Sequence, residues 1–482
     1  MIRDTVSFER IWKRLYGDTV NSKAIIAFVQ FIEKKFAFEA VYDSTQFLHG
    51  RVDMADLFAL AEQMHDAGVI LEYHKNGNSP DEPQVSFWGA RYRDSQEEGM
   101  SGGCTLDDDR HSLTCALAEG LERHIWFECD DYFKQPIIAT TAYIAHTKKI
   151  LAPESFAGFS EAQRKEKKSL ALAPEKEFLW IRGSSLHDVS PIWIPAQVIS
   201  AAPRVNARRK NDAEPLIRRV VTTGLATHPD RTQALLSGAL EIIERDAYII
   251  TWLNRLSPAR VDIDALCTQS ASLQKLVNVC RRYRLQPHIL RLPTDAPAYA
   301  IGAVLKDETG NGPVIALGLK AGSSLETTAE KAIIEALRGR RGARTRFNQN
   351  EKPDPAAPIG HYDRLTYWAD PSNSEKLEFL IKGPIEKMPG SAWDHDTPER
   401  HLQRIVAWCS AKNYGCASVA FTSSKGNCTP WHIEMVVIPE LQPLYYSESL
   451  PHIGGARLTE IPTQFGYKIR TPFFTEEPHP FA

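Results

Sequence analysis

Two stretches of the chain carry the same pattern of charged residues, Glu-x-x-Glu-Arg, set among alanine, leucine and isoleucine. The two copies supply Glu119, Glu122 and Arg123, and Glu241, Glu244 and Arg245. In an α-helix, residues three apart are neighbours on one face, so each pair of carboxylates could hold a hard cation. The arginine that follows each pair could then reach a phosphate group, because a guanidinium presents a fork of N–H donors that matches phosphate oxygens.

A third helical segment, Lys331–Arg338, adds Glu335 and further cations at similar spacing. Together the three segments predict a magnesium nucleotide site. The same pattern is also typical of a solvated helix face with intrahelical ion pairs. The apolar neighbours favour buried carboxylates instead, and because an unpaired buried carboxylate is costly, a bound cation is a common remedy.

Composition predicts a globular cytoplasmic protein. With 482 residues, 43% of them hydrophobic, the chain is long enough for a large core, and its net charge of -3 argues against a main role in coating nucleic acid. The eight cysteines include no Cys-x-x-Cys pair, which suits reduced thiols better than disulfides or a structural zinc. The N-terminus lacks the apolar core of a signal peptide, and no apolar run approaches the length of a membrane span, so no membrane partner is expected. The net charge likewise gives no reason to expect nucleic acid as a partner.

Hydrophobic spacing predicts an α+β fold. Helices are expected at 7–40, 53–68, 230–254, 270–283, 325–340 and 399–411, and strands at 69–73, 137–144, 178–183, 192–196, 298–304 and 314–319. These elements lack the strict βαβ rhythm and the glycine loop of Rossmann and P-loop proteins. Residues 346–396 are rich in Pro, Asn, Asp and Gly and are expected to form a surface excursion.

Three motifs in order resemble the YcaO family of ATP-dependent enzymes that modify peptide backbones. The first is Ser101–Thr105 followed by the helix that carries Glu119; the second is Thr222–Pro229 running into the helix that carries Glu241; the third is Lys331–Glu335. One such motif is weak evidence, whereas three in order are strong. The resemblance implies a YcaO-type α+β fold over residues 41–482. The apolar stripes before it predict a helical N-terminal extension over residues 1–40, which could be part of the core or could dock a partner.

The resemblance also implies which residues bind ATP and Mg2+. The magnesium ligands would be Glu119, Glu122, Gln233, Glu241, Glu244 and Glu335, and the nucleotide contacts Arg51, Arg123, Ala226, Arg245 and Lys331. Two positions depart from the family pattern. Gln233 stands where a glutamate is usual and coordinates more weakly, and Lys331 replaces the fork of an arginine with a point charge.

The chain ends in Glu-Glu-Pro-His-Pro-Phe-Ala. Alternating prolines stiffen such a tail toward an extended rod, suited to threading a terminal carboxylate into a pocket. Azoline-forming members of the family commonly end in a proline-rich tail, so the resemblance implies a catalytic role for the carboxylate of Ala482, which replaces the usual final proline.

The activity implied is an ATP- and Mg2+-dependent cyclodehydratase that converts Cys, Ser or Thr of a ribosomally made precursor peptide into thiazolines or oxazolines. The thiol or hydroxyl of the substrate attacks the preceding carbonyl, ATP phosphorylates the resulting oxygen, and phosphate leaves. The partners implied are an E1-like or leader-peptide-binding protein in trans, a flavin dehydrogenase where azoles form, and a homodimer or hetero-complex.

Two alternatives remain open. Within the family, the same ATP site can serve thioamidation or amidine formation. From another class, residues 20–75 also fit a winged helix, in a scaffold or regulatory protein that binds DNA or another protein.

Overall fold

The computed structural model describes residues 53–93, 98–128, 136–210, 214–310, 312–349, 361–387, 390–394, 396–421, 429 and 431–481. The chain divides into two compact units, Met1–Val52 and Asp53–Ala482, and every described residue belongs to the second. The predicted extension at 1–40, most of the predicted winged helix, Arg51 and Ala482 therefore lie outside the described residues.

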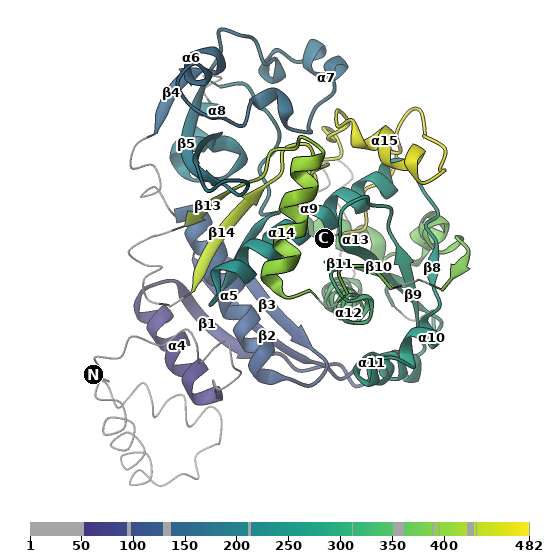
Figure 1. Ribbon diagram of the computed structural model, residues 1–482. Helices are drawn as coiled ribbons and strands as arrows, with labels where there is room; N and C mark the ends of the chain where they lie inside the picture. Colours follow the sequence, from purple (N-terminus) through teal and green to yellow (C-terminus); the bar gives the residue numbers. More distant parts are fainter. Residues whose placement is uncertain are drawn as a thin grey trace, which may run out of the picture. The chain divides into compact units, whose positions relative to one another are not determined.

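Three sheets, mostly antiparallel, make up the β-structure (Figure 1). The small sheet contains β1 (Ile70–Lys75), β2 (Ser86–Arg93) and β3 (Glu98–Thr105) in that order. The second sheet has the order β11 (Ile315–Gly322), β10 (Tyr299–Asp307), β9 (Leu285–Arg291), β8 (Arg260–Val261) and β12 (Ile385–Glu386), with β8 and β12 parallel. The third contains β4 (Ile137–Thr140), β5 (Glu177–Ser185), β13 (Ala417–Phe421), β14 (His432–Val437) and β7 (Leu225–His228), and β6 (Pro191–Pro195) also pairs with β5. This architecture confirms the α+β prediction.

Three long helices carry the charged motifs: α5 (Asp109–Glu128), α9 (Arg231–Leu253) and α12 (Leu325–Asn348). The other α-helices are α4 (Met54–Asp66), α6 (Thr141–Ala145), α7 (Glu161–Glu166), α8 (Pro203–Lys210), α10 (Ile263–Cys267), α11 (Ala271–Arg282), α13 (His361–Ala369), α14 (Pro398–Ala411) and α15 (Arg457–Gln464). The described residues also contain the 3-10 segments η2 (Pro153–Ser155), η3 (Lys168–Leu170), η4 (Ala196–Val198) and η5 (Pro371–Ile381). Among the described residues, no helix combines the length and the apolar character that crossing a membrane requires.

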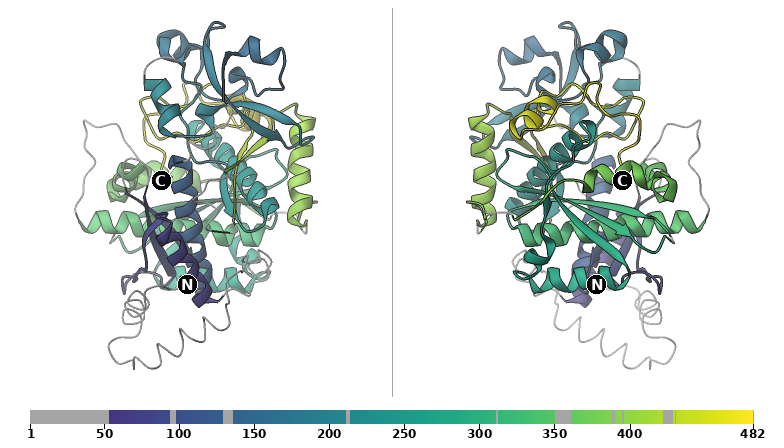
Figure 2. Two further views of the ribbon diagram at one scale, coloured as in Figure 1. Left: turned by 90° about the vertical axis from the view of Figure 1, so that its left-hand side faces the viewer. Right: turned by 90° about the vertical axis from the view of Figure 1, so that its right-hand side faces the viewer.

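Each long helix follows a strand after a short turn, and we call these pairs strand–helix units: β3–α5, β7–α9 and β11–α12 (Figure 2). Side chains at the N-caps start two of the helices, since Asp230 accepts a hydrogen bond from the Gln233 N–H and Ser324 accepts one from the Thr327 N–H. Each helix also contacts the strand of another unit: α5 contacts β7, α9 contacts β11, and α12 contacts β3. The three units therefore close into a cycle.

Two glycines let helices lie directly against strands. A Cβ atom added to Gly103 on β3 would lie 1.9 Å from the Ser112 carbonyl oxygen of α5, and one added to Gly318 on β11 would lie 2.1 Å from the Ala332 carbonyl oxygen of α12. No side chain fits at such distances. This close packing brings helical side chains within reach of the strand amides.

Helix α9 lies at the centre of the core. It is apolar on most of its surface, and Ala247, Tyr248 and Trp252 are almost fully buried. A helix that is hydrophobic all round is expected to be enclosed by protein. Phe474 and Phe481 of the C-terminal segment pack in the same cluster, so the last described residue is part of the core.

Two sequence predictions were wrong. The strand expected at 137–144 ends at Thr140, because this side chain caps α6 by accepting the Tyr143 N–H. The segment 346–396 is not a surface excursion in its described part: α12 runs on to Asn348, and α13 and η5 place Trp368 and Phe379 in the core. The apolar residues of α13 and η5 recur at helical spacing, and their burial outweighs the polar composition of the segment.

Candidate functional site

The first glutamate of each motif is held in the same way. Each carboxylate oxygen Oε2 accepts a backbone N–H from a residue 16 or 17 positions earlier: Glu119 from Gly102 (3.0 Å), Glu241 from Gly224 (3.0 Å) and Glu335 from Leu319 (2.7 Å). Gly102 and Leu319 lie on β3 and β11, and Gly224 directly precedes β7. One backbone amide, on a strand or directly before it, therefore fixes each carboxylate, and the geometry repeats in all three strand–helix units.

The side chains three residues further along each helix reach toward another unit. Glu244 Oε2 accepts the Ala321 N–H of β11 at 3.0 Å, and Arg338 Nη2 donates to Glu119 Oε2 at 2.9 Å. Glu122, the equivalent residue of α5, is close enough to Glu241 for the negative charge of Glu241 to act on it. The charged residues of the three helices therefore converge where the units meet.

Four cations lie among these carboxylates. Arg245 Nη2 donates to Glu241 Oε1 at 3.2 Å and Arg245 Nη1 lies 2.5 Å from Glu244 Oε1, while Arg123 lies 3.6 Å from Glu119. Lys320 on β11 is near Glu244 and Glu335, and Arg338 pairs with Glu119. The sequence motifs identified Arg123 and Arg245. The third helical segment included Arg338 without assigning it a role, and sequence reasoning missed Lys320 as a site residue.

Sequence signals existed for both of these cations. Arg338 stands three residues after Glu335, at the spacing that separates Glu119 from Glu122 in the first motif. Lys320 is the one charged residue of the otherwise apolar strand Ile315–Gly322.

Burial and mutual repulsion act on two of the glutamates. Burial raises the pKa of Glu122 to about 8, with Glu241 and Glu119 adding to the rise and Arg123 opposing it. Burial likewise raises the pKa of Glu244, again against the effect of its neighbouring arginine. Burial acts in the same direction on Glu119, yet Arg338 and Arg123 bring the pKa of Glu119 below its usual value. The neighbouring cations therefore stabilise the charged form of Glu119, whereas they do not fully offset the burial of Glu122 and Glu244.

The raised pKa of Glu122 predicts a pH dependence of stability without bound metal. Between about pH 5 and pH 8 the folded protein holds a proton on Glu122 that the unfolded chain has released, so the contribution of Glu122 to the free energy of unfolding should fall as pH rises through this window, by on the order of a few kcal/mol. Denaturant unfolding of the unaltered protein and of Glu122→Gln at a series of pH values in EDTA measures this contribution as the difference between the two. Glu460→Gln, at an exposed position of α15, should have the same pH dependence as the unaltered protein. An equal pH dependence in the unaltered protein and in Glu122→Gln would contradict the prediction.

The remaining predicted residues lie at varied places. Gln233 is in the first turn of α9, about 12 Å along the helix axis before Glu241. Ala226 is buried on β7, opposite Glu434 of β14. Lys331 reaches solvent one turn before Glu335, and partial burial together with Lys320 lowers its pKa.

The C-terminal segment reaches the charged cluster. The Phe481 ring centroid lies 4.0 Å from the Arg245 guanidinium carbon, a cation–π contact. Two hydrogen bonds fix the residues before it: His479 Nε2 with the Tyr445 carbonyl oxygen at 2.6 Å, and Trp368 Nε1 donating to the Pro478 carbonyl oxygen at 3.0 Å. The last described residue therefore lies against a cation of the site.

The donor set fits a hard divalent cation and an anionic ligand. Carboxylate oxygens are the ligands that Mg2+ prefers, and arginine and lysine are the phosphate-binding side chains. As the side chains lie, the described residues contain no group of three or more His, Cys, Asp or Glu that could hold a metal ion. Arg123 and Arg245 form ion pairs with the glutamates of their own helices, so a metal ion would compete with these two arginines for the carboxylates.

Comparison with known families decides the classification. The sequence model of the family described as YcaO cyclodehydratase, ATP- and Mg2+-binding, matches residues 105–442, more than two thirds of the chain. The chain belongs to the YcaO family. The match contains α5 and the units β7–α9 and β11–α12, whereas β3 lies before it except for Thr105. No curated protein sequence matches the chain.

Solved structures share the YcaO fold at low sequence identity. A heterocyclase in complex with substrate and cofactor has a TM-score of 0.67 at 18% identity, with 87% of this chain and 57% of that chain covered. YcaO from Methanopyrus kandleri, bound with AMPPCP and Mg2+, has a TM-score of 0.57 at 16% identity, covering 80% of this chain and 90% of that one. The E. coli microcin synthetase McbBCD complex has a TM-score of 0.55 at 14% identity, covering 76% and 87%. The chain thus spans little more than half the length of the first of these relatives.

Proposed function

We propose that the protein is an ATP- and Mg2+-dependent cyclodehydratase that forms thiazolines or oxazolines from Cys, Ser or Thr of a ribosomally synthesised peptide. The observation that carries the proposal is the convergence of carboxylates and cations from three helices within the region that matches the YcaO family. Phosphoryl transfer requires charge neutralisation and alignment far more than covalent help from the protein, and this site offers both.

The proposal assigns a role to each group of residues. Magnesium would be held by Glu119, Glu122, Gln233, Glu241, Glu244 and Glu335, and would neutralise the charge of the phosphates. Arg245 and Lys331 would contact phosphate oxygens, with Arg51, Arg123 and Ala226 completing the nucleotide contacts. The carboxylate of Ala482, one residue beyond the ring that covers Arg245, would face the reacting residue of the peptide.

The cysteines of this chain favour a reaction in which the substrate provides the nucleophile. Cys104 lies near Arg338, and burial raises the pKa of its thiol to about 12 despite this arginine. A thiol with such a pKa is protonated at neutral pH and is a poor nucleophile. A thiol or hydroxyl of the peptide would attack its own preceding carbonyl.

The proposed assembly is a complex. The McbBCD structure is by its name a complex, and another structure of this complex contains pro-MccB17. By analogy we propose that this chain works in the cytoplasm as a homodimer or hetero-complex. An E1-like or leader-peptide-binding protein would act in trans, and a flavin dehydrogenase would act where azoles are formed.

Intact-mass analysis tests the proposed function. The full chain, ATP, Mg2+, a candidate precursor peptide and the products of neighbouring genes are incubated together. Loss of one water per ring, together with loss of a thiol that iodoacetamide can alkylate, is the expected result for a cysteine substrate. Amidine formation also removes water but consumes an amine, and thioamidation exchanges oxygen for sulfur. An unchanged peptide mass with all partners present would overturn the assignment.

A further inference from the structure

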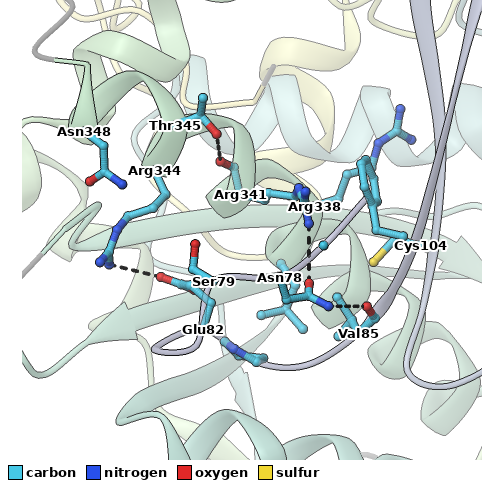
Figure 3. A pocket seen from close by; sticks show the side chains of 14 residues that line it. Asn78, Ser79, Glu82, Val85, Cys104, Arg338, Arg341, Arg344, Thr345 and Asn348 are labelled. Atoms are coloured by element: carbon cyan, nitrogen blue, oxygen red, sulfur yellow. Dashed lines mark hydrogen bonds and ion pairs between the residues drawn. The ribbon is translucent and has the colours of Figure 1, made fainter. Parts of the chain in front are cut away.

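A polar cavity lies between α12 and the segment that joins β1 to β2 (Figure 3). It is lined by Gly77, Asn78, Ser79, Glu82, Pro83, Val85, Phe87, Cys104, Leu337, Arg338, Arg341, Arg344, Thr345 and Asn348. Arg338 lines the cavity and also forms an ion pair with Glu119 of the candidate nucleotide site, so the cavity lies next to the carboxylate cluster.

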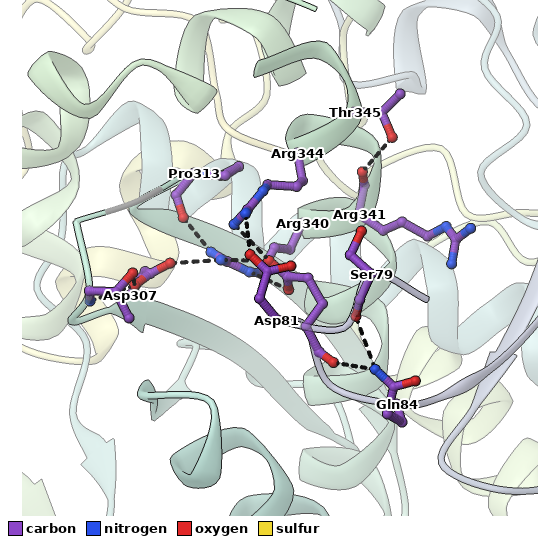
Figure 4. A network of polar contacts seen from close by, with 11 residues as sticks. Ser79, Asp81, Gln84, Asp307, Pro313, Arg340, Arg341, Arg344 and Thr345 are labelled. Atoms are coloured by element: carbon purple, nitrogen blue, oxygen red, sulfur yellow. Dashed lines mark hydrogen bonds and ion pairs between the residues drawn. The ribbon is translucent and has the colours of Figure 1, made fainter. Parts of the chain in front are cut away.

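Positive charge dominates the lining. Three arginines, Arg338, Arg341 and Arg344, project from one face of α12, because positions three apart in a helix are neighbours. Glu82 is the acidic lining residue, and it already accepts hydrogen bonds from Arg340, at 2.9 Å to each of its two oxygens, and from Arg344 at 3.1 Å. Figure 4 shows Arg340 and Arg344 with the side chains of Asp307 and Asp81, with which they also pair. The Glu82 carboxylate is therefore held by Arg340 and Arg344, and among the described residues no hydrogen bond or ion pair joins it to Arg341.

Arg341 has no acidic partner among the described residues. Its Nη1 donates to Asn78 Oδ1 at 3.4 Å, and its guanidinium carbon lies 4.7 Å from the Phe87 ring centroid. Burial lowers the pKa of Arg341, and the side chain that opposes this effect is Cys104, whose own thiol is protonated at neutral pH. A partly buried guanidinium held over an aromatic ring, with its fork unpaired by a carboxylate, is prepared to receive an oxyanion.

The internal repetition of the fold leads to the same conclusion. Where α5 and α9 face another unit, the second charged residue of the motif is Glu122 or Glu244. At the third junction, between α12 and β3, that residue is Arg338, which lies near Cys104. This junction therefore carries a positive charge where the other two carry a negative one, and its arginine lines the cavity.

We propose that this cavity binds an oxyanion, a carboxylate or phosphate group, with Arg341 as its principal ligand and Arg338 beside it. Asn348 provides further N–H donors in the lining, and Ser79 provides a hydroxyl group. The oxyanion comes either from inorganic phosphate or from an acidic side chain of a bound peptide. The proposal concerns a site separate from the metal ligands and does not depend on the reaction proposed above.

Calorimetric titration of the full chain without ATP or peptide tests the proposal. Inorganic phosphate and N-acetyl-glutamate amide are titrated separately, with sodium chloride at equal ionic strength as the reference. Saturable binding of at least one probe is expected, and Arg341→Gln should weaken it at least tenfold. Arg282→Gln, which removes an exposed arginine of α11, should leave it unchanged. Binding of phosphate alone identifies a phosphate subsite, whereas binding of the glutamate probe identifies a peptide carboxylate.

Two outcomes would overturn the proposal: no saturable binding of either probe, or equal affinity in the unaltered protein and Arg341→Gln. The second outcome would place the anion in the candidate nucleotide site. Arg341→Lys keeps the positive charge but loses the forked N–H donors of the guanidinium, so it should bind the probe with intermediate affinity. This variant supplies the comparison if Arg341→Gln does not fold.

Discussion

Glu241→Gln is expected to reduce the rate of ATP-dependent cyclodehydration by about 100-fold or more without unfolding the protein. The glutamine carbonyl can still accept the Gly224 N–H, so the strand–helix contact survives. The variant removes one negative charge from the site, which both weakens magnesium binding and releases Arg245 from an ion pair. The rate of peptide mass loss at increasing Mg2+ measures the effect, and thermal unfolding shows whether the fold is kept.

A matched substitution distinguishes the role of this charge from a general effect of acidic residues. Glu460→Gln removes an exposed carboxylate from α15 and should leave the rate unchanged. A Glu241→Gln variant that turns over at the unaltered rate across the whole Mg2+ range would show that Glu241 does not hold the metal.

Deletion of Phe481 and Ala482 should also reduce the rate by about 100-fold or more, for a different reason. The deletion removes the ring that covers Arg245 and the terminal carboxylate proposed to face the substrate. His479 and its hydrogen bond to Tyr445 remain, so most of the tail should stay packed. Measurement of kcat and KM separates the two effects, since loss of a group that acts only in the transition state lowers kcat.

A one-residue extension isolates the carboxylate. One glycine added after Ala482 keeps Phe481 in place but moves the charged end by about 3.5 Å, and it should lower kcat nearly as much as the deletion. Glu476→Gln, at an exposed position of the same tail, should have little effect. Normal kcat in the extended protein would show that the terminal carboxylate has no catalytic role.

The local parts of the structure could be predicted from the sequence. Helical spacing alone identified α9, α11 and α14 to within about two residues, because apolar positions and capping residues are encoded within each segment. The motifs identified the glutamates that the structure places together. Local signals fail at Thr140, where a cap competes with a strand, and at α13, where burial outweighs polar composition.

The non-local parts could not be predicted from the sequence. No sequence pattern states that the Glu244 carboxylate reaches the Ala321 amide, 77 residues away, or that Arg338 pairs with Glu119. These contacts depend on how the three strand–helix units pack, and Lys320 gains its place only from that packing. Arg341 is likewise an unremarkable helix arginine until the segment between β1 and β2 folds over it.

The closed cycle of strand–helix units has a consequence for biosynthesis of the protein. The contact that joins the last unit to the first, between Arg338 and Glu119, spans 219 residues. Contacts of such sequence separation form late, because the intervening chain must first be ordered. A nascent chain that has emerged only as far as α9 lacks Arg338, the partner of Glu119, and also lacks the β11 amide that donates to Glu244. The candidate site should therefore not assemble before α12 has been synthesised.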